Sequence, residues 1–337
     1  MSDRVLEGQH IAGTGRLADY SNLVKLPHTI FAMPFALVGA TLASYVYPIT
    51  LRHVALILAA FTAARFAAMG FNRIVDRGID AKNPRTRMRE IPAGKLSVRQ
   101  ATAAVVLASA VFLLCAALLN PLCLALAPLA LGWVFFYSYT KRFTRWAHLV
   151  LGFALGIAPV GAYLAVSGRW SHPAGALLAL AGAVLCWVAG FDILYSLQDI
   201  EFDRGEGLHS IPAALGAKGA LTVSRILHLL SVALFAAVGT MVPGLGTLYF
   251  FGVAMIAVML VYEQSLVRAA DFSRIDAAFF NVNGAISVVF FLVVLAERIW
   301  LARSAARPSP SASPARAARR TLCGCSAPSP RRPRRCG

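Results

Sequence analysis

Two short windows of the chain gather acidic side chains at spacings that could bind a metal ion. In the first window, Asn72, Asp76 and Asp80 follow one another at intervals of four residues. In the second window, polar residues recur at intervals of three, four and four, namely Asp192, Tyr195, Asp199 and Asp203. On an α-helix, either spacing places its residues along one face. Each window therefore predicts a polar stripe at the end of a helix.

Carboxylates stacked in this way destabilise an isolated helix by roughly a few tenths of a kcal/mol per pair, so a compensating ligand is expected. Mg²⁺ takes oxygen ligands, usually one or two carboxylates together with substrate phosphates. Helix capping and solvation could explain Asp80 or Glu206 alone, but not two full stripes. The loop after the first stripe could contact the same phosphates, and its cationic residues are Lys82, Arg85, Arg87, Arg89 and Lys95. The pattern predicts a site for a magnesium diphosphate.

The elements that must position these stripes are predicted to be transmembrane helices. Hydrophobic residues make up 58% of the chain and charged residues 14%, with a mean hydropathy of +0.67, which is a membrane composition. A transmembrane helix needs about 20 apolar residues. Such runs occur near residues 29–50, 53–75, 98–118, 121–139, 146–166, 173–198, 219–240, 245–265 and 275–300. We therefore expect an all-α membrane protein, a bundle of about nine transmembrane helices.

The net charge of +17 is distributed in a way that indicates membrane topology rather than binding to nucleic acid. Nine arginines lie from Arg303 onward, which leaves +8 for the rest of the chain (17 minus 9). The loops after the second, fourth, sixth and eighth runs hold thirteen Lys and Arg residues, whereas the opposite loops hold Arg52 and Arg169. The positive-inside rule then predicts that the N-terminus and both acidic windows face the cytoplasm.

Three parts of the chain are expected: an N-terminal cytoplasmic segment (1–28), a transmembrane domain (29–300) and a basic tail (301–337). The tail is rich in Pro, Ser, Ala and Arg and has no periodicity, so we expect it to be disordered. Cys323 and Cys325 form a lone Cys-x-Cys pair in this tail, which is a weak signal for a metal site.

With these patterns in view, the chain resembles the UbiA superfamily of intramembrane aromatic prenyltransferases, typified by 4-hydroxybenzoate polyprenyltransferase. The resemblance rests on the Asn-x3-Asp-x3-Asp spacing of the first window, on the whole second window, and on Arg65 at the family's spacing before the first. The segments "RTRMREIPAGKLS" and "SYTKRFTRWAHLVLG", which contains Lys141, are also similar to the family. The resemblance covers roughly residues 20 to 300.

This resemblance implies Mg²⁺-dependent transfer of a polyprenyl group from a polyprenyl diphosphate to a hydroxylated aromatic acid, with 4-hydroxybenzoate the leading acceptor. The expected place is the inner membrane of a bacterium, and the expected role is in respiratory quinone biosynthesis. "REIPAG" and "YSLQDIEFDRGEGLHS" look more like a subgroup linked to menaquinone than the ubiquinone enzymes. The pathway therefore stays open between ubiquinone and menaquinone.

The resemblance and the chemistry together suggest a role for each candidate residue. The expected Mg²⁺ ligands are Asn72, Asp76, Asp80, Asp199 and Asp203, and Lys141, Arg142 and loop arginines would contact the diphosphate. Tyr195, Tyr137 and Tyr139 could stabilise an allylic cation through their ring faces, but for the aromatic cluster 133–139 interfacial placement and packing are the favoured interpretation. Asp192 or Asp199 would orient the phenol or take its proton. Arg65 would bind the acceptor carboxylate or the diphosphate, and Gly152, Gly156 and Gly161 could permit close helix packing.

Two alternatives come from other classes of protein. A CDP-alcohol phosphotransferase also uses magnesium aspartates, but it expects Asp-Gly upstream and a glycine where Asn72 stands. A transporter would place its acidic residues near the bilayer midplane on interrupted helices, whereas these residues lie at helix ends. Both patterns fit less well than that of a prenyltransferase.

Overall fold

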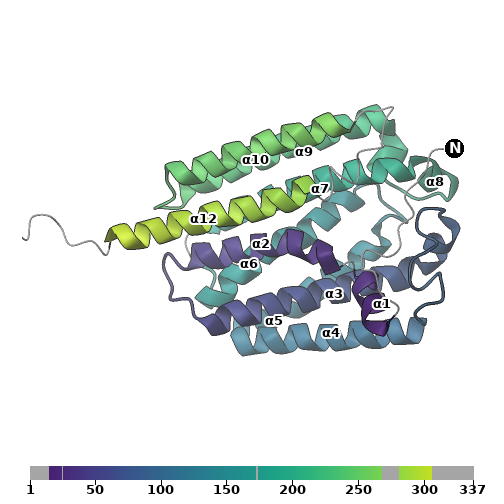
Figure 1. Ribbon diagram of the computed structural model, residues 1–337, viewed down its shortest axis with the longest axis horizontal. Coiled ribbons are helices and arrows are strands. Elements are labelled where there is room, and N and C mark those ends of the chain that lie inside the picture. Colours follow the sequence, from purple (N-terminus) through teal and green to yellow (C-terminus); the bar gives the residue numbers. More distant parts are fainter. Residues whose placement is uncertain (1–14, 25, 172–173, 268–280, 306–337) are drawn as a thin grey trace, which may run out of the picture. The chain divides into compact units, whose positions relative to one another are not determined.

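The computed structural model describes residues 15–24, 26–171, 174–267 and 281–305, and within these ranges all regular structure is helical (Figure 1). The segment expected to be a disordered tail lies outside the described residues from 306 onward. The chain forms one compact unit that ends at Arg298, and Ile299–Gly337 is a second unit. The helices are α1 (Arg16–Leu23), α2 (Leu26–Ala43), α3 (Leu51–Lys82), α4 (Val98–Leu119), α5 (Pro121–Thr140), α6 (Ala147–Ser167), α7 (Ala174–Ser196), the short 3₁₀-helix η1 (Leu197–Asp199), α8 (Ile200–Gly205), α9 (Ile211–Met241), α10 (Thr247–Leu266) and α12 (Asn283–Ala305).

Eight helices in the described ranges are long and apolar enough to cross a membrane: α3, α4, α5, α6, α7 with its continuation through α8, α9, α10 and α12. They match the last eight of the nine predicted runs, so the chain is a multi-pass membrane protein. The first predicted run, 29–50, ends earlier than expected, because α2 ends at Ala43. Turns and extended backbone follow, until Thr50 caps α3.

The helix that carries the first acidic window is longer than the sequence suggested. α3 runs through 32 residues to Lys82, past the predicted end at residue 75. At 1.5 Å per residue it spans roughly 48 Å, whereas a hydrocarbon core is about 30 Å thick. Its last turns therefore extend beyond the apolar layer, and these turns carry Asn72, Asp76 and Asp80.

The most deeply buried helix is α7, which packs chiefly on α6 and α9, while α3 packs chiefly on α4. The predicted close packing is present at Gly152 and Gly156, because a Cβ at Gly156 would come within 2.7 Å of the Ala181 carbonyl oxygen. It is wrong for Gly161, where a Cβ would meet nothing within 4 Å. α6 and α7 therefore approach each other closely in the N-terminal half of α6.

The spacing of the second acidic window predicted one regular helix, but the structure divides this window between α7, η1 and α8. After Ser196 the chain tightens into η1, which ends at Asp199, and then continues as α8. A 3₁₀ turn has three residues instead of 3.6, so it rotates the following residues relative to an α-helical stripe. Despite this change, Asp192, Asp199 and Asp203 all line the same cavity.

Candidate active site

A cavity of about 760 Å³ brings the two acidic windows together. Side chains from both windows and from the loop after α3 form its polar end: Asn72, Asp76, Asp80, Asn83, Arg85, Thr86, Arg89, Lys141, Arg142, Asp192, Tyr195, Asp199 and Asp203. Apolar residues of α2, α3, α4, α5 and α6 line most of the remainder. Leu129 lines the cavity and is 70% exposed, so this side borders the membrane-facing surface of α5.

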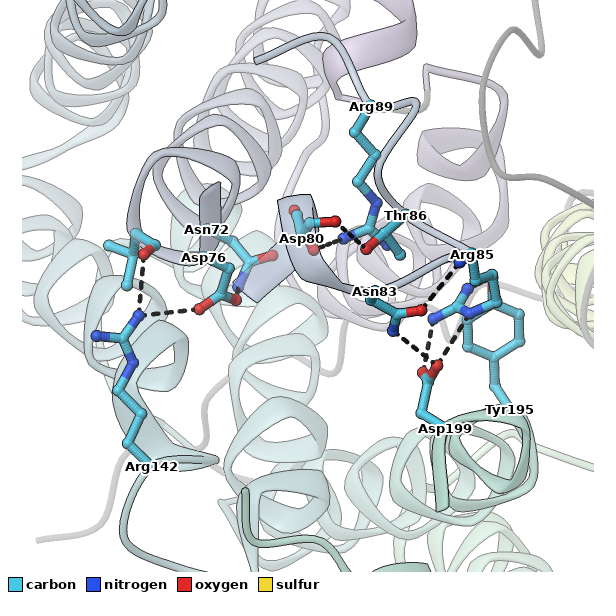
Figure 2. Close-up of polar contacts among 11 residues, drawn as sticks. Asn72, Asp76, Asp80, Asn83, Arg85, Thr86, Arg89, Arg142, Tyr195 and Asp199 are labelled. Atoms are coloured by element: carbon cyan, nitrogen blue, oxygen red, sulfur yellow. Dashed lines mark hydrogen bonds and ion pairs between the residues drawn. The ribbon is translucent and has the colours of Figure 1, made fainter. Parts of the chain in front are cut away.

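Hydrogen bonds connect the first acidic window to Arg142, in the loop after α5. Asp76 accepts a hydrogen bond from the Asn72 amide, Nδ2–Oδ2 2.8 Å, and one from Arg142, Nη2–Oδ1 3.2 Å (Figure 2). Arg142 also donates to the carbonyl oxygen of Val75. Because the Asn72 nitrogen is used in this way, its amide oxygen remains as an acceptor for another ligand.

The loop after α3 folds back and connects the two windows. The Arg85 guanidinium donates two hydrogen bonds to the Asp199 carboxylate and a third, of 3.0 Å, to the Tyr195 hydroxyl (Figure 2). Its carbon Cζ lies 5.2 Å from the centre of the Tyr195 ring. Asn83 donates to Asp199 Oδ1 at 3.1 Å and accepts from the Arg85 backbone N–H at 2.9 Å. Asp199 is therefore held by charged and neutral donors from the first window's loop.

A second arginine of this loop reaches the last carboxylate of α3. Arg89 Nη1 lies 2.6 Å from Asp80 Oδ1, and both side chains are largely buried. The other oxygen, Asp80 Oδ2, is buried and has no hydrogen-bond partner within the described chain, and the same is true of Asp203 Oδ2. Buried acceptors without donors are unfavourable, by about 1–3 kcal/mol each. Asp80 and Asp203 both line the cavity, so their carboxylates lie where a ligand could bind.

The donor set at this end fits Mg²⁺ bound jointly with phosphates. Among the residues described, no three His, Cys, Asp or Glu side chains converge closely enough to hold a metal ion by themselves. Mg²⁺ commonly needs fewer protein ligands than this, because phosphates and waters complete its shell. The oxygens without partners on Asp80 and Asp203, together with the Asn72 amide oxygen, are ligands of the required type.

Lys141 supplies a cation between the two windows. Burial acts to lower the pKa of its ammonium group, but the nearby Asp203, Asp199 and Asp192 carboxylates outweigh it, and the pKa is raised above its ordinary value. A raised pKa keeps the ammonium charged throughout the neutral range. Lys141 can thus pair with an anionic ligand at neutral pH.

Arg65 lies two helical turns deeper on α3 than Asn72, roughly 10 Å along the helix axis. It lines the cavity, and its Nε is buried without a hydrogen-bond partner within the described chain. An arginine in a membrane helix is costly unless it faces a partner or a polar cavity. Arg65 therefore marks a second place in this cavity where an anion would be stabilised.

Asp192 differs from the other carboxylates in its partner. Its Oδ2 lies 2.6 Å from Nδ1 of His148, a wholly buried residue in the first turn of α6. Asp76, Asp80 and Asp199 each pair with an arginine instead. The site thus contains three carboxylates that pair with arginines and one, Asp192, that pairs with a histidine.

The cavity lining includes the residues proposed from the sequence as metal ligands, substrate contacts or proton acceptors: Arg65, Asn72, Asp76, Asp80, Lys141, Arg142, Asp192, Tyr195, Asp199 and Asp203. Of the three tyrosines, Tyr137 and Tyr195 line the cavity. Tyr139 does not: it is 41% exposed and lies beneath the Arg142 guanidinium, because it is on the outer side of α5.

Sequence reasoning missed four residues of this site as individual candidates: Asn83, Arg85, Arg89 and His148. Asn83 could have been found, because it continues the stripe of Asn72, Asp76 and Asp80 at a further interval of three residues. The two arginines were considered only as part of a basic loop. His148 gave no signal, since a single histidine in an apolar run is usually a packing residue.

Comparisons with known proteins show which family the chain is similar to. The UbiA prenyltransferase family model matches residues 32–295. A 4-hydroxybenzoate octaprenyltransferase of Citrobacter koseri is 33% identical over 242 residues, which cover 70% of this chain and 81% of the relative. That of Edwardsiella ictaluri is 31% identical over 231 residues, which cover 68% of this chain and 78% of the relative.

Solved structures with the same fold extend the comparison. A UbiA homolog from Aeropyrum pernix K1 in its apo form has a TM-score of 0.72 and 40% identity, covering 80% of this chain and 98% of that one. A UbiA homolog from Archaeoglobus fulgidus bound to GPP and Mg²⁺ has a TM-score of 0.67 and 20% identity, covering 83% and 99%, and shows the fold alone. Since the family match extends through the helices that carry both acidic windows, the chain belongs to the UbiA prenyltransferase family.

Proposed function

We propose that the protein transfers a polyprenyl group from a polyprenyl diphosphate to a small hydroxylated aromatic acid, with 4-hydroxybenzoate as the leading acceptor and Mg²⁺ as cofactor. The observation that carries the proposal is one cavity with an acidic and basic end, apolar walls, and an arginine deeper inside whose Nε has no hydrogen-bond partner within the described chain. Such a cavity matches a substrate with a charged head and an apolar tail. The relatives named 4-hydroxybenzoate octaprenyltransferase support the choice of acceptor. The CDP-alcohol phosphotransferase and transporter alternatives gain no support from the family match.

The polar end would bind the diphosphate and the metal together. Asn72, Asp76, Asp80, Asp199 and Asp203 would hold Mg²⁺, which when bound would neutralise negative charge on the departing diphosphate. Four cationic residues would contact the phosphate oxygens: Arg85, Arg89, Lys141 and Arg142. Arg85 and Arg89 would exchange carboxylate oxygens for phosphate oxygens, since guanidinium groups bind both in the same bidentate manner. A prenyl diphosphate and Mg²⁺ as ligands are supported by the Archaeoglobus fulgidus homolog, which was solved bound to GPP and Mg²⁺.

The apolar part of the cavity would protect the reacting carbon. Departure of the diphosphate leaves an allylic carbon with cationic character, which water would consume. Tyr137 and Tyr195 line the cavity, and an aromatic ring face turned to the reacting carbon would stabilise positive charge by roughly 0.5–2 kcal/mol. These residues therefore favour transfer to the aromatic acceptor over hydrolysis.

Arg65 and Asp192 would position the acceptor. Arg65 would bind its carboxylate, because the roughly 10 Å along α3 between Arg65 and Asn72 separates it from the diphosphate end. Asp192, which lines the cavity, would then accept the proton that the acceptor releases.

The proposed location is the inner membrane of a bacterium, with the acidic windows on the cytoplasmic side. The support is the excess of basic residues in the loops on that side. Labelling of a single cysteine placed at position 84, with reagents applied from each side, tests the orientation. Labelling only from outside would contradict it.

The experiment that tests the function uses membranes containing the protein, a radiolabelled polyprenyl diphosphate, Mg²⁺ and a panel of phenolic acids. The panel includes 4-hydroxybenzoate and a dihydroxynaphthoic acid as a menaquinone-type acceptor, so product formation also separates the two quinone pathways. We expect labelled product with one hydroxylated aromatic acid, and none after chelation of Mg²⁺. Release of free prenyl alcohol with every acceptor would contradict the proposal.

A further inference from the structure

His148 lies behind Asp192 rather than in the cavity. Its side chain is wholly buried in the first turn of α6, and it does not line the cavity, whereas Asp192 on α7 does and is 17% exposed. The single hydrogen bond of the imidazole within the described chain joins Nδ1 to Asp192 Oδ2 at 2.6 Å. The Nε2 atom is buried and has no hydrogen-bond partner there. All polar contact of this imidazole is therefore directed at one carboxylate.

Packing alone does not account for a histidine at this position. A buried imidazole with one nitrogen unsatisfied is less stable than an apolar side chain of similar volume, by about 1–3 kcal/mol. The hydrogen bond also fixes the tautomer, because with Asp192 ionised the donor must be Nδ1–H. Donation to Oδ2 leaves Asp192 Oδ1 for a ligand in the cavity.

The choice of a histidine partner also distinguishes Asp192 from the other carboxylates of the site. Asp76, Asp80 and Asp199 pair with arginines, which always carry a positive charge. Asp192 is held by the His148 imidazole instead. The carboxylates that would handle phosphate and metal are thus paired with arginines, whereas the one that would receive the proton is not.

We propose that His148 is a positioning residue for Asp192: it holds one carboxylate oxygen and turns the other into the cavity to take the acceptor's proton. The inference rests on the proposed function. In that reaction the allylic C–O bond breaks and its electron pair leaves with the diphosphate, while a ring carbon of the acceptor forms the new C–C bond. One proton leaves the acceptor and is received by Asp192. His148 keeps its own proton throughout.

Three substitutions test this role because they change the donor in different ways. In His148→Asn, the amide nitrogen can occupy the place of Nδ1 and still donate to Asp192. In His148→Gln, the amide nitrogen reaches the place of Nε2, and His148→Leu removes the donor while filling the volume. We expect kcat to fall about 10- to 100-fold in the Leu and Gln variants, as for other groups that orient a reactive side chain. We expect the Asn variant to stay within about threefold of wild type.

Further measurements separate positioning from a general loss of structure. The KM for the polyprenyl diphosphate should change less than about twofold in all three variants, because His148 does not contact the diphosphate end. His148→Leu combined with Asp192→Asn should be no slower than Asp192→Asn alone, since His148 acts through Asp192. His228→Leu is the matched control, a buried histidine on α9 that does not line the cavity. Its kcat per folded protein should match wild type.

The outcomes distinguish this inference from the proposed function. If the wild-type protein forms no prenylated acceptor in the same assay, the proposed function is wrong and the inference falls with it. If wild type is active and His148→Leu is equally active, the inference alone is wrong. Equal losses in the Asn and Leu variants, or multiplicative losses in the double mutant, would also overturn it.

Discussion

Arg85 and Asp199, which are 114 positions apart in the sequence, form a two-point ion pair that connects the two acidic windows. Nη2 of the guanidinium lies 2.6 Å from Oδ2 of the carboxylate, and Nε lies 3.1 Å from Oδ1. Both side chains are largely buried, so water screens the pair only weakly. The loop after α3 is thereby fixed over the polar end of the cavity.

Arg85→Ala is expected to raise the KM for the polyprenyl diphosphate and to lower kcat/KM about 10- to 100-fold, because it removes charge-assisted hydrogen bonds. Arg85→Lys should be intermediate, since it keeps the charge but loses the two-point geometry. Arg77→Ala is the control, an exposed arginine on α3 outside the cavity lining. Steady-state kinetics with varied diphosphate measures all three. Equal losses in the Arg77 and Arg85 variants would argue for a general charge effect.

Asp76→Asn and Asp199→Asn should each lower turnover strongly and increase the Mg²⁺ concentration needed for half-maximal activity. The double mutant should lose less turnover than the product of the two single losses, because two residues that act together in one site do not contribute independently. Glu201→Gln serves as a control, since this exposed residue lies in α8 but not in the cavity lining. The double-mutant cycle is obtained by measuring the turnover of wild type, both single mutants and the double mutant at saturating and at limiting Mg²⁺. Strict additivity with unchanged Mg²⁺ dependence would indicate two separate sites.

Arg65→Ala should raise the KM for the aromatic acid more than the KM for the diphosphate, because Arg65 lies away from the acidic end. A loss of about 1.5–3 kcal/mol is expected for a hydrogen bond to a charged group, which is roughly 10- to 150-fold in affinity. Arg52→Ala, an exposed residue at the opposite end of α3, should leave both constants unchanged. Equal rises in both KM values would remove Arg65 from the acceptor role.

Gly156→Ala should lower the free energy of unfolding by about 1–3 kcal/mol, because the added Cβ meets the backbone of α7 and overpacks the contact. Gly161→Ala is the matched control on the same helix, with nothing within 4 Å of the added atom. Denaturation of the purified protein in detergent compares the two. A Gly161 variant as unstable as the Gly156 variant would show that an effect other than packing against α7 governs the loss.

The sequence predicted the transmembrane helices well because runs of apolar residues are determined by the bilayer, not by neighbouring helices. It underestimated α3, whose last turns are charged and so carry no apolar signal. It also missed the 3₁₀ turn at Leu197–Asp199, because that turn depends on contacts made by the folded loop. The pairing of Arg85 with Asp199 and of His148 with Asp192 could not be predicted, since each joins residues from separate helices or loops.

The partly lipid-facing wall near Leu129 bears on how the protein selects its prenyl donor. Moving a hydrocarbon tail from the bilayer to an apolar cavity gains little free energy, because lipid chains are as apolar as leucine side chains. Affinity must then come mainly from the diphosphate, and each additional isoprene unit should contribute little to it. The length of the tail on the product would accordingly be set by whichever diphosphate the membrane contains, rather than measured by the protein.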